Sequence, residues 1–177
     1  MQAKVYSFLL TILTTIYGNA QMGTATDVFD MVRQGKTQEI ALVLKSNPRA
    51  FQVVNSDGFT PLIIASYRGQ VKAVQMLIDG GVLVNHVSPM GTALTAAVFK
   101  GYTDITEILL KNKADANLPD EQGNTPLMIA CQFKNETLVK LLLQYGALKD
   151  LKNKSGQTAF EMAVLSENQS IVNLLKQ

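Results

Sequence analysis

One phrase returns four times along this chain at a nearly constant interval. The sequence reads TPLIIAS from Thr60, TALTAAV from Thr92, TPLMIAC from Thr125 and TAFEMAV from Thr158. The four threonines are separated by 32, 33 and 33 residues. A repeat of this length is typical of architectures in which one small supersecondary unit is stacked many times.

Each phrase has the features of a helix start. A glycine precedes the threonine in every unit, as Gly58, Gly91, Gly123 and Gly156, and glycine adopts the positive φ angles of a tight turn. The threonine hydroxyl can accept a hydrogen bond from a free N–H of the first helical turn. Pro61 and Pro126 follow two of the threonines, at the helical position where a missing N–H does no harm. The phrase therefore predicts the same short helix in each unit.

A second helix is predicted after a turn in each unit. Gly69 and Gly101 hold the turn in two units, and Lys134–Asn135 and Glu167–Asn168 hold it in the later two, where we expect asparagine to tolerate the left-handed geometry. Apolar residues then recur at helical spacing, in VKAVQMLI, ITEILL, LVKLLL and IVNLL. Since one such helix pair cannot bury both of its faces, the units must stack to form a core.

These parts resemble the ankyrin repeat family, whose pattern combines a loop glycine, T-P-L-H-x-A, a turn glycine and a leucine-rich second helix. The matching segments are GFTPLIIA with LIDGGVLVN, GTALTAA with LLKNKADAN, and GNTPLMIA with LLLQYGA. The resemblance implies an all-α solenoid of helix-turn-helix units joined by extended loops. We expect one domain over residues 21–177, with about five repeats including two caps, at 24–53, 54–86, 87–119, 120–152 and 153–177.

The sequence departs from the family pattern in two respects. The histidine of T-P-L-H is replaced by Ile63, Thr95, Met128 and Glu161, so we expect its hydrogen bonds to be lost or replaced. Gly91 directly precedes Thr92, which makes that loop one residue shorter than the others. We expect a different loop geometry there.

Residues 1–20 have the layout of a secretory signal peptide. Lys4 precedes an apolar stretch from Val5 to Tyr17, and Gly18 and Ala20 precede a potential cleavage site before Gln21. The alternative is a retained membrane anchor, although the apolar stretch is shorter than the roughly 20 residues of a membrane span. Because secreted ankyrin-type chains resemble bacterial periplasmic proteins, we expect a periplasmic or secreted protein with no stable membrane insertion after cleavage.

The composition offers little for catalysis. The net charge is +2, with 16 Lys and Arg against 14 Asp and Glu, which argues against a nucleic-acid-binding protein. The chain has one histidine, His86, and one cysteine, Cys131, which we expect to be a loop residue and a small buried thiol. No catalytic or metal-binding motif surrounds them. We therefore expect a monomeric protein without enzymatic activity, cofactor or metal.

The resemblance implies that another protein binds the concave face, formed by loop tips and first helices. Candidate residues lie seven or eight positions after each threonine, and in the loop tips: Phe59, Tyr67, Arg68, Met90, Phe99, Lys100, Glu121, Gln122, Asn124, Gln132 and Phe133. Aromatic rings serve interfaces and cores equally well, so they either contact a partner or cover the adjoining repeat. The partner's role stays open between an enzyme that is assisted or protected and a toxin that is neutralised. A membrane-tethered scaffold is a further alternative if residues 1–20 are retained.

Overall fold

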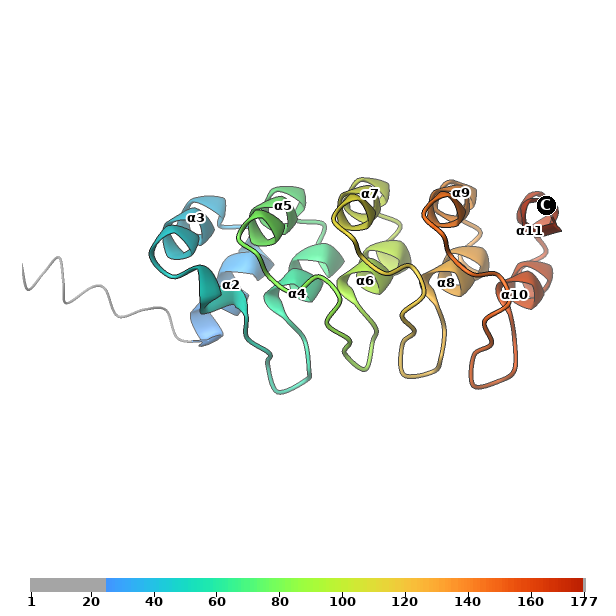
Figure 1. Ribbon diagram of the computed structural model, residues 1–177, viewed down its shortest axis with the longest axis horizontal. Helices are drawn as coiled ribbons and strands as arrows, with labels where there is room; N and C mark the ends of the chain where they lie inside the picture. The colour runs from blue at the N-terminus through green and yellow to red at the C-terminus, as the bar shows by residue number, and fades with distance from the viewer. Residues whose placement is uncertain (1–24, 177) are drawn as a thin grey trace, which may run out of the picture.

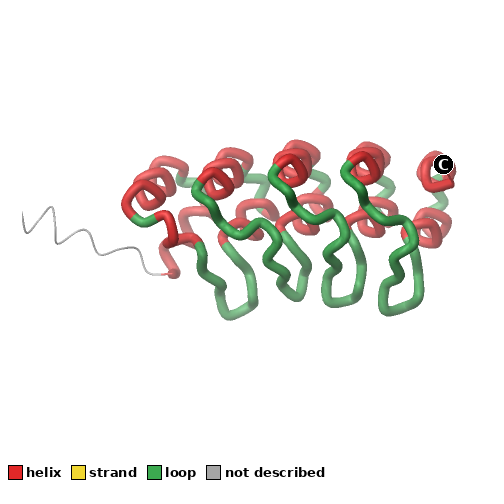
Figure 2. Tube along the Cα trace, viewed as in Figure 1, coloured by secondary structure: helices red, strands yellow, loops and turns green. Residues whose placement is uncertain are grey.

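Two rows of helices stacked side by side make up the protein, as the computed structural model shows for residues 25–176 (Figure 1). The predicted signal peptide lies outside these described residues. Five helix pairs follow one another along the stack, and loops project from the side of the first-helix row (Figure 2). Within the described residues, the only β-type pairing is an isolated bridge between Ser88 and Gly91. The predicted all-α solenoid of helix-turn-helix units is therefore confirmed.

The two rows contain the first and second helices of the units. The first helices are α2 (Ala25–Gln34), α4 (Pro61–Tyr67), α6 (Ala93–Lys100), α8 (Pro126–Gln132) and α10 (Ala159–Leu165). The second helices are α3 (Thr37–Ser46), α5 (Val71–Asp79), α7 (Thr103–Lys111), α9 (Glu136–Gln144) and α11 (Gln169–Lys176). A 3-10 turn, η1 (Pro48–Phe51), follows α3. Among the described residues, no helix is both long enough and apolar enough to cross a membrane.

The repeated threonines cap the first helices, as predicted. Thr60 Oγ1 accepts a hydrogen bond from the Ile63 N–H at 3.3 Å, and Thr125 Oγ1 accepts one from the Met128 N–H at 3.4 Å. Thr92 and Thr158 form the same bond in α6 and α10. Each hydroxyl satisfies one backbone donor that has no partner inside the helix, so the recurring phrase fixes where each first helix begins.

The turn between the helices differs from the prediction in two units. Lys134 and Glu167 adopt the left-handed conformation, each with φ 57°, whereas the asparagines that follow them cap the next helix. Asn135 Oδ1 accepts from the Leu138 N–H at 3.1 Å, and Asn168 does the same for Ile171. The left-handed residue is thus a lysine or a glutamate, because asparagine is needed one position later as a helix cap.

The loop before α6 has the different geometry that its length predicts. In the longer loops, a hydrogen bond runs from the first residue to the fifth, for example from the Asp120 N–H to the Asn124 carbonyl at 3.0 Å. In the short loop, Ser88 and Gly91 exchange two backbone hydrogen bonds at 2.9 Å. Gly91 has φ 87°, a conformation that favours glycine.

The residues that replace the family's histidine fall into two classes. Ile63 and Met128 are buried and contribute apolar packing. Thr95 and Glu161 instead bond back to the capping threonine of their own unit and complete a capping box. The expected hydrogen bonds are therefore replaced within the unit at Thr95 and Glu161, and apolar packing takes their place at Ile63 and Met128.

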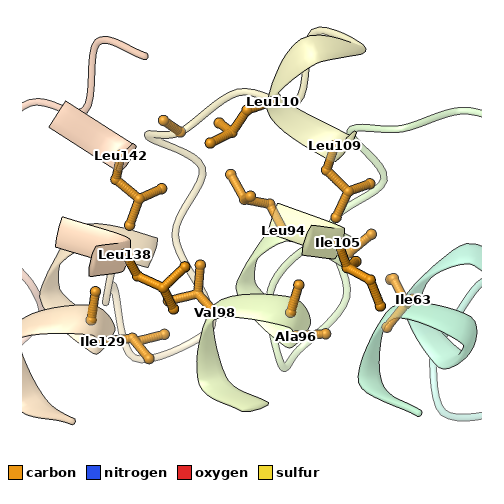
Figure 3. Close-up of a cluster of buried hydrophobic side chains, with 14 of the residues drawn as sticks. Ile63, Leu94, Ala96, Val98, Ile105, Leu109, Leu110, Ile129, Leu138 and Leu142 are labelled. Atoms are coloured by element: carbon orange, nitrogen blue, oxygen red, sulfur yellow. The ribbon is translucent and has the colours of Figure 1, made fainter. Parts of the chain in front are cut away.

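Leucine and isoleucine side chains from both rows meet between the two layers (Figure 3). Leu94 of the first row and Ile105 and Leu109 of the second are almost completely buried, as are Leu138 and Leu142 in the next unit. Because first helices pack on neighbouring first helices and second helices on second, each unit completes its core only with its neighbours.

Candidate binding groove

A groove of about 550 Å³ opens between the projecting loops and the first helices. We call this groove the concave groove. Its lining residues come from α2, α4, α6 and α8, from the loops that precede α4, α6 and α8, and from Arg68 directly after α4. They are Arg33, Asn55, Asp57, Phe59, Ile63, Ile64, Tyr67, Arg68, Met90, Thr95, Ala96, Phe99, Asp120, Gln122 and Ile129. The groove therefore crosses four consecutive units.

Six of the predicted candidate residues line this groove. They are Phe59, Tyr67, Arg68, Met90, Phe99 and Gln122. The other five, Lys100, Glu121, Asn124, Gln132 and Phe133, do not line it, although Lys100 and Phe133 contact residues that do. Gln132 is exposed.

Three aromatic rings form a continuous row along the ends of the first helices. The Tyr67 and Phe99 rings are nearly parallel, with centroids 6.5 Å apart. The Phe99 and Phe133 rings meet edge to face at 5.2 Å. We call Tyr67, Phe99 and Phe133 the aromatic row. Since the rings are 38%, 44% and 52% exposed, they both join neighbouring units and present apolar surface to solvent.

Positive charges accompany this row. The Lys100 Nζ lies 5.2 Å from the centre of the Tyr67 ring, a position that favours a cation–π attraction. Arg68, directly after α4, is exposed and lines the groove. Arg33, in the last turn of α2, lines it too and pairs with Asp30 at 2.7 Å. Cations therefore stand at the ends of three consecutive first helices.

Hydrogen bonds between loops fix the loop-tip candidates. The Glu121 N–H donates to the Pro89 carbonyl at 3.0 Å, and Asn124 Oδ1 accepts from Asn153 Nδ2 at 2.9 Å. The Gln122 carbonyl accepts from the Lys154 N–H at 2.9 Å. These bonds hold neighbouring loops together, so Asn124 has a structural role in positioning the loop wall of the groove.

The model for "Ankyrin repeats (3 copies)" matches residues 28–120 and again residues 94–177. The chain belongs to the ankyrin repeat family. Because the matches extend across all five helix pairs, the concave groove is built from ankyrin repeats throughout. Ankyrin repeats indicate a module for protein–protein interaction.

Several ankyrin-containing relatives match over part of their length. The chain is 31% identical over 120 residues to "Ankyrin repeat and SAM domain-containing protein 6" of Rattus norvegicus, covering 66% of this chain and 14% of the relative. It is 34% identical over 92 residues to "Serine/threonine-protein kinase 12" of Arabidopsis thaliana, covering 51% of this chain and 20% of the relative. For "Inactive serine/threonine-protein kinase TEX14" of Mus musculus, the identity is 33% over 112 residues, covering 59% of this chain and 8% of the relative.

This ankyrin chain spans at most a fifth of the length of these three relatives. The similarity therefore concerns the shared repeats, and the kinase activity in a relative's name says nothing about this chain.

Sequence reasoning missed nine lining residues of the concave groove. In the divergent first unit, Thr26 holds the sequence position of the repeated threonine, and Arg33 lies seven residues after it. The same count that reached Tyr67 and Phe99 would therefore have reached Arg33. Ile63, Ile64, Ala96 and Ile129 form an apolar floor from the third and fourth helical positions, along with Thr95. Asn55, Asp57 and Asp120 come from the loops. Asn55 and Asp120 are equivalent first positions of their loops, and Asp57 corresponds to Gln122 of the later loop.

The sole histidine lies in a loop and the sole cysteine is buried, as predicted. His86 Nε2 lies 3.1 Å from the Gly58 carbonyl of the preceding loop. Cys131 is buried and unpaired in α8, and burial raises the pKa of its thiol to about 12. Among the described residues, no group of three or more His, Cys, Asp or Glu side chains could hold a metal ion.

Proposed function

We propose that this ankyrin-repeat chain is a non-enzymatic binding module whose concave groove holds a partner protein. The observation that carries the proposal is the aromatic row, which is partly exposed along the edge of a groove with an apolar floor. Aromatic side chains with neighbouring cations are enriched among the residues that dominate binding energy at interfaces. The same face carries six of the candidate residues named from the sequence.

The state of the reactive side chains supports the non-enzymatic part of this proposal. A cysteine nucleophile needs a lowered thiol pKa, and burial raises that of Cys131. His86 lies against a backbone carbonyl in an inter-repeat loop, so it is placed to join two loops.

The proposed location is the bacterial periplasm. It rests on residues 1–20, whose order of Lys4, apolar stretch and Gly18–Ala20 is typical of a cleaved signal peptide. N-terminal sequencing of protein from fractionated cells should give a chain that begins near Gln21. Intact Met1 on membrane-bound protein would support the tethered-scaffold alternative instead.

In this compartment, we propose that the module assists or protects a partner enzyme. Neutralising a toxin, as an immunity protein does, is the alternative, and the identity of the captured partner separates the two. We also propose that the module itself is monomeric, which sedimentation analysis of the purified protein can test.

Comparative affinity isolation tests the binding role. Phe133→Ala removes a ring of the aromatic row that is 52% exposed, and Tyr145→Ala removes a ring after α9 that is 37% exposed and does not line the groove. We expect Phe133→Ala to weaken binding of the native partner by about 1–3 kcal/mol, the scale of interface hot spots, whereas Tyr145→Ala leaves it unchanged. The reverse pattern would place the partner on the second-helix row.

A further inference from the structure

The charges that line the concave groove are separated by sign. Among the described residues, two cations line it and both belong to first helices: Arg33 is in the last turn of α2, and Arg68 directly follows α4. The lining carboxylates, Asp57 and Asp120, belong to the loops that precede α4 and α8. Cations therefore border the groove at the C-terminal ends of first helices, and carboxylates border it beyond their N-terminal ends.

One charge of each sign is available to a ligand. Arg68 and Asp57 are exposed, and within residues 25–176 neither side chain forms an ion pair or a hydrogen bond. The other two are engaged, because Arg33 pairs with Asp30 and Asp120 accepts hydrogen bonds inside its own loop. Arg68 and Asp57 lie beyond the two ends of the same helix, so α4 separates two opposite charges that do not meet.

The length of the first helices sets the width of the apolar floor. The helices α4, α6 and α8 have seven or eight residues, so they are about 10–12 Å long at a rise of 1.5 Å per residue. The floor residues Ile63, Ala96 and Ile129 lie along them. An α-helix with its side chains is itself about 10–12 Å across. One helix lying across the first helices would therefore cover the floor from the loops to the helix ends.

A bound helix can also direct side chains toward both borders of the floor. When its apolar stripe faces the floor, the residues on the two sides of the stripe point toward the loops and toward the helix ends. A strand alternates its side chains between two opposite faces, so a strand with one face on the floor would point the other to solvent. The groove crosses four first helices, and three spacings of about 8–10 Å match a helix of roughly 16–20 residues.

We propose that the concave groove holds an amphipathic helix of its partner, whose apolar stripe is bordered by carboxylates on one side and by cations on the other. The carboxylates face Arg68 and the cations face Asp57. The apolar stripe contacts the floor formed by Ile63, Ala96 and Ile129. This inference rests on the proposed function and names the element and the charge pattern of its partner.

Three labelled peptides of about 18 residues, the length of the groove, test the charge pattern and the conformation. All have a stripe of leucines at helical spacing, alanines on the outward face, and equal numbers of glutamates and lysines. The first has glutamates on one side of the stripe and lysines on the other, and the second alternates them on both sides. The third is the first with a central alanine replaced by proline, which breaks a helix. In fluorescence anisotropy at nanomolar peptide, the first should bind at least about tenfold more tightly than the others, a difference of about 1.4 kcal/mol.

Charge-reversal variants tie binding to the two borders. Arg68→Glu and Asp57→Lys should each weaken binding of the first peptide about tenfold, because an attraction becomes a repulsion. The double variant should recover most of the lost affinity, since a helix turned end for end presents its acidic side to the opposite border. Arg49→Glu and Asp150→Lys make the same charge changes at exposed residues that do not line the groove, and they should have no effect.

Urea unfolding of each variant separates binding from stability, because cations at helix C-termini also favour the helix macrodipole. Equal binding of the first two peptides, undiminished binding of the proline peptide, no binding of any peptide, or a double variant weaker than both single variants would each overturn the inference. If Phe133→Ala still releases the native partner in that event, the binding role of the groove stands and only the helical, charge-separated partner falls.

Discussion

Phe99 is the ring whose removal best separates packing from binding in the aromatic row. It is the middle member, in contact with Tyr67 on one side and Phe133 on the other. It is 44% exposed, so slightly more than half of its surface is removed from solvent. Full truncation of a buried phenylalanine to alanine costs about 3–5 kcal/mol, and the exposed fraction reduces this to about 2 kcal/mol.

The ring contacts add to this cost. An edge-to-face pair is worth about 0.5–1.5 kcal/mol beyond its buried area. We therefore expect Phe99→Ala to lower the free energy of unfolding by about 2–3 kcal/mol. The melting temperature should fall by roughly 4–12 °C, since a chain of this size loses about 2–4 °C per kcal/mol.

Urea unfolding followed by circular dichroism measures this loss, and a double-mutant cycle isolates the ring pair. Phe99→Ala, Phe133→Ala and the double variant should give a coupling of about 0.5–1.5 kcal/mol. Leu165→Ala is the control, because Leu165 holds the same position in the last unit, is 66% exposed and has no aromatic ring. We expect that variant to lose less than about 1 kcal/mol.

A loss below about 0.5 kcal/mol at Phe99, together with additive effects in the cycle, would refute this reasoning. The rings would then be separate in solution, and the row would act purely as a binding surface.

Three further predictions concern single positions. Ser66→Ala should raise stability by about 1 kcal/mol in urea unfolding, because the buried Ser66 hydroxyl has no hydrogen-bond partner. Lys134→Gly should raise it by roughly 0.5–1 kcal/mol by relieving the left-handed backbone. Cys131 should resist thiol reagents at pH 8 while folded, since burial raises the pKa of its thiol from 9.0 to about 12. Between these two values the thiol ionises only in the unfolded protein, so the free energy of unfolding should fall as the pH rises from 9 to 12.

Matched variants control the first two of these predictions, and a labelling result tests the third. Thr106→Val should destabilise, since the Thr106 hydroxyl donates to the Tyr102 carbonyl at 2.8 Å; a loss at Ser66→Ala as well would mean that both hydroxyls are satisfied. Gly101→Ala should cost about 1–2 kcal/mol, because φ is 74° and an added Cβ meets only Asn135 Nδ2 at 3.7 Å. Rapid labelling of Cys131 without loss of helix would contradict its burial.

The stacked fold could be predicted from the sequence because its determinants are local and repeated. Each capping threonine acts on a backbone N–H three residues away, so one spacing rule placed the start of every first helix after the first unit. The choice of left-handed residue could not be predicted in the same way. At Lys134–Asn135, asparagine would suit either the left-handed turn position or the helix cap. Asn135 is the cap and Lys134 takes the left-handed conformation, because a lysine side chain cannot accept the hydrogen bond of a cap.

The candidate groove depends on contacts between units, which counting positions along one helix does not describe. A count along the helix identifies which residues reach its rim, and the same count from Thr26 extends the rim to Arg33. It cannot say that Phe99 lies against two other rings, because those contacts depend on which side chain the neighbouring unit presents. For the same reason, the sequence could not show that the buried Ser66 hydroxyl has no hydrogen-bond partner. Val98 and Cys131 hold the equivalent positions in α6 and α8, and only the packed structure shows that an apolar side chain suits all three positions.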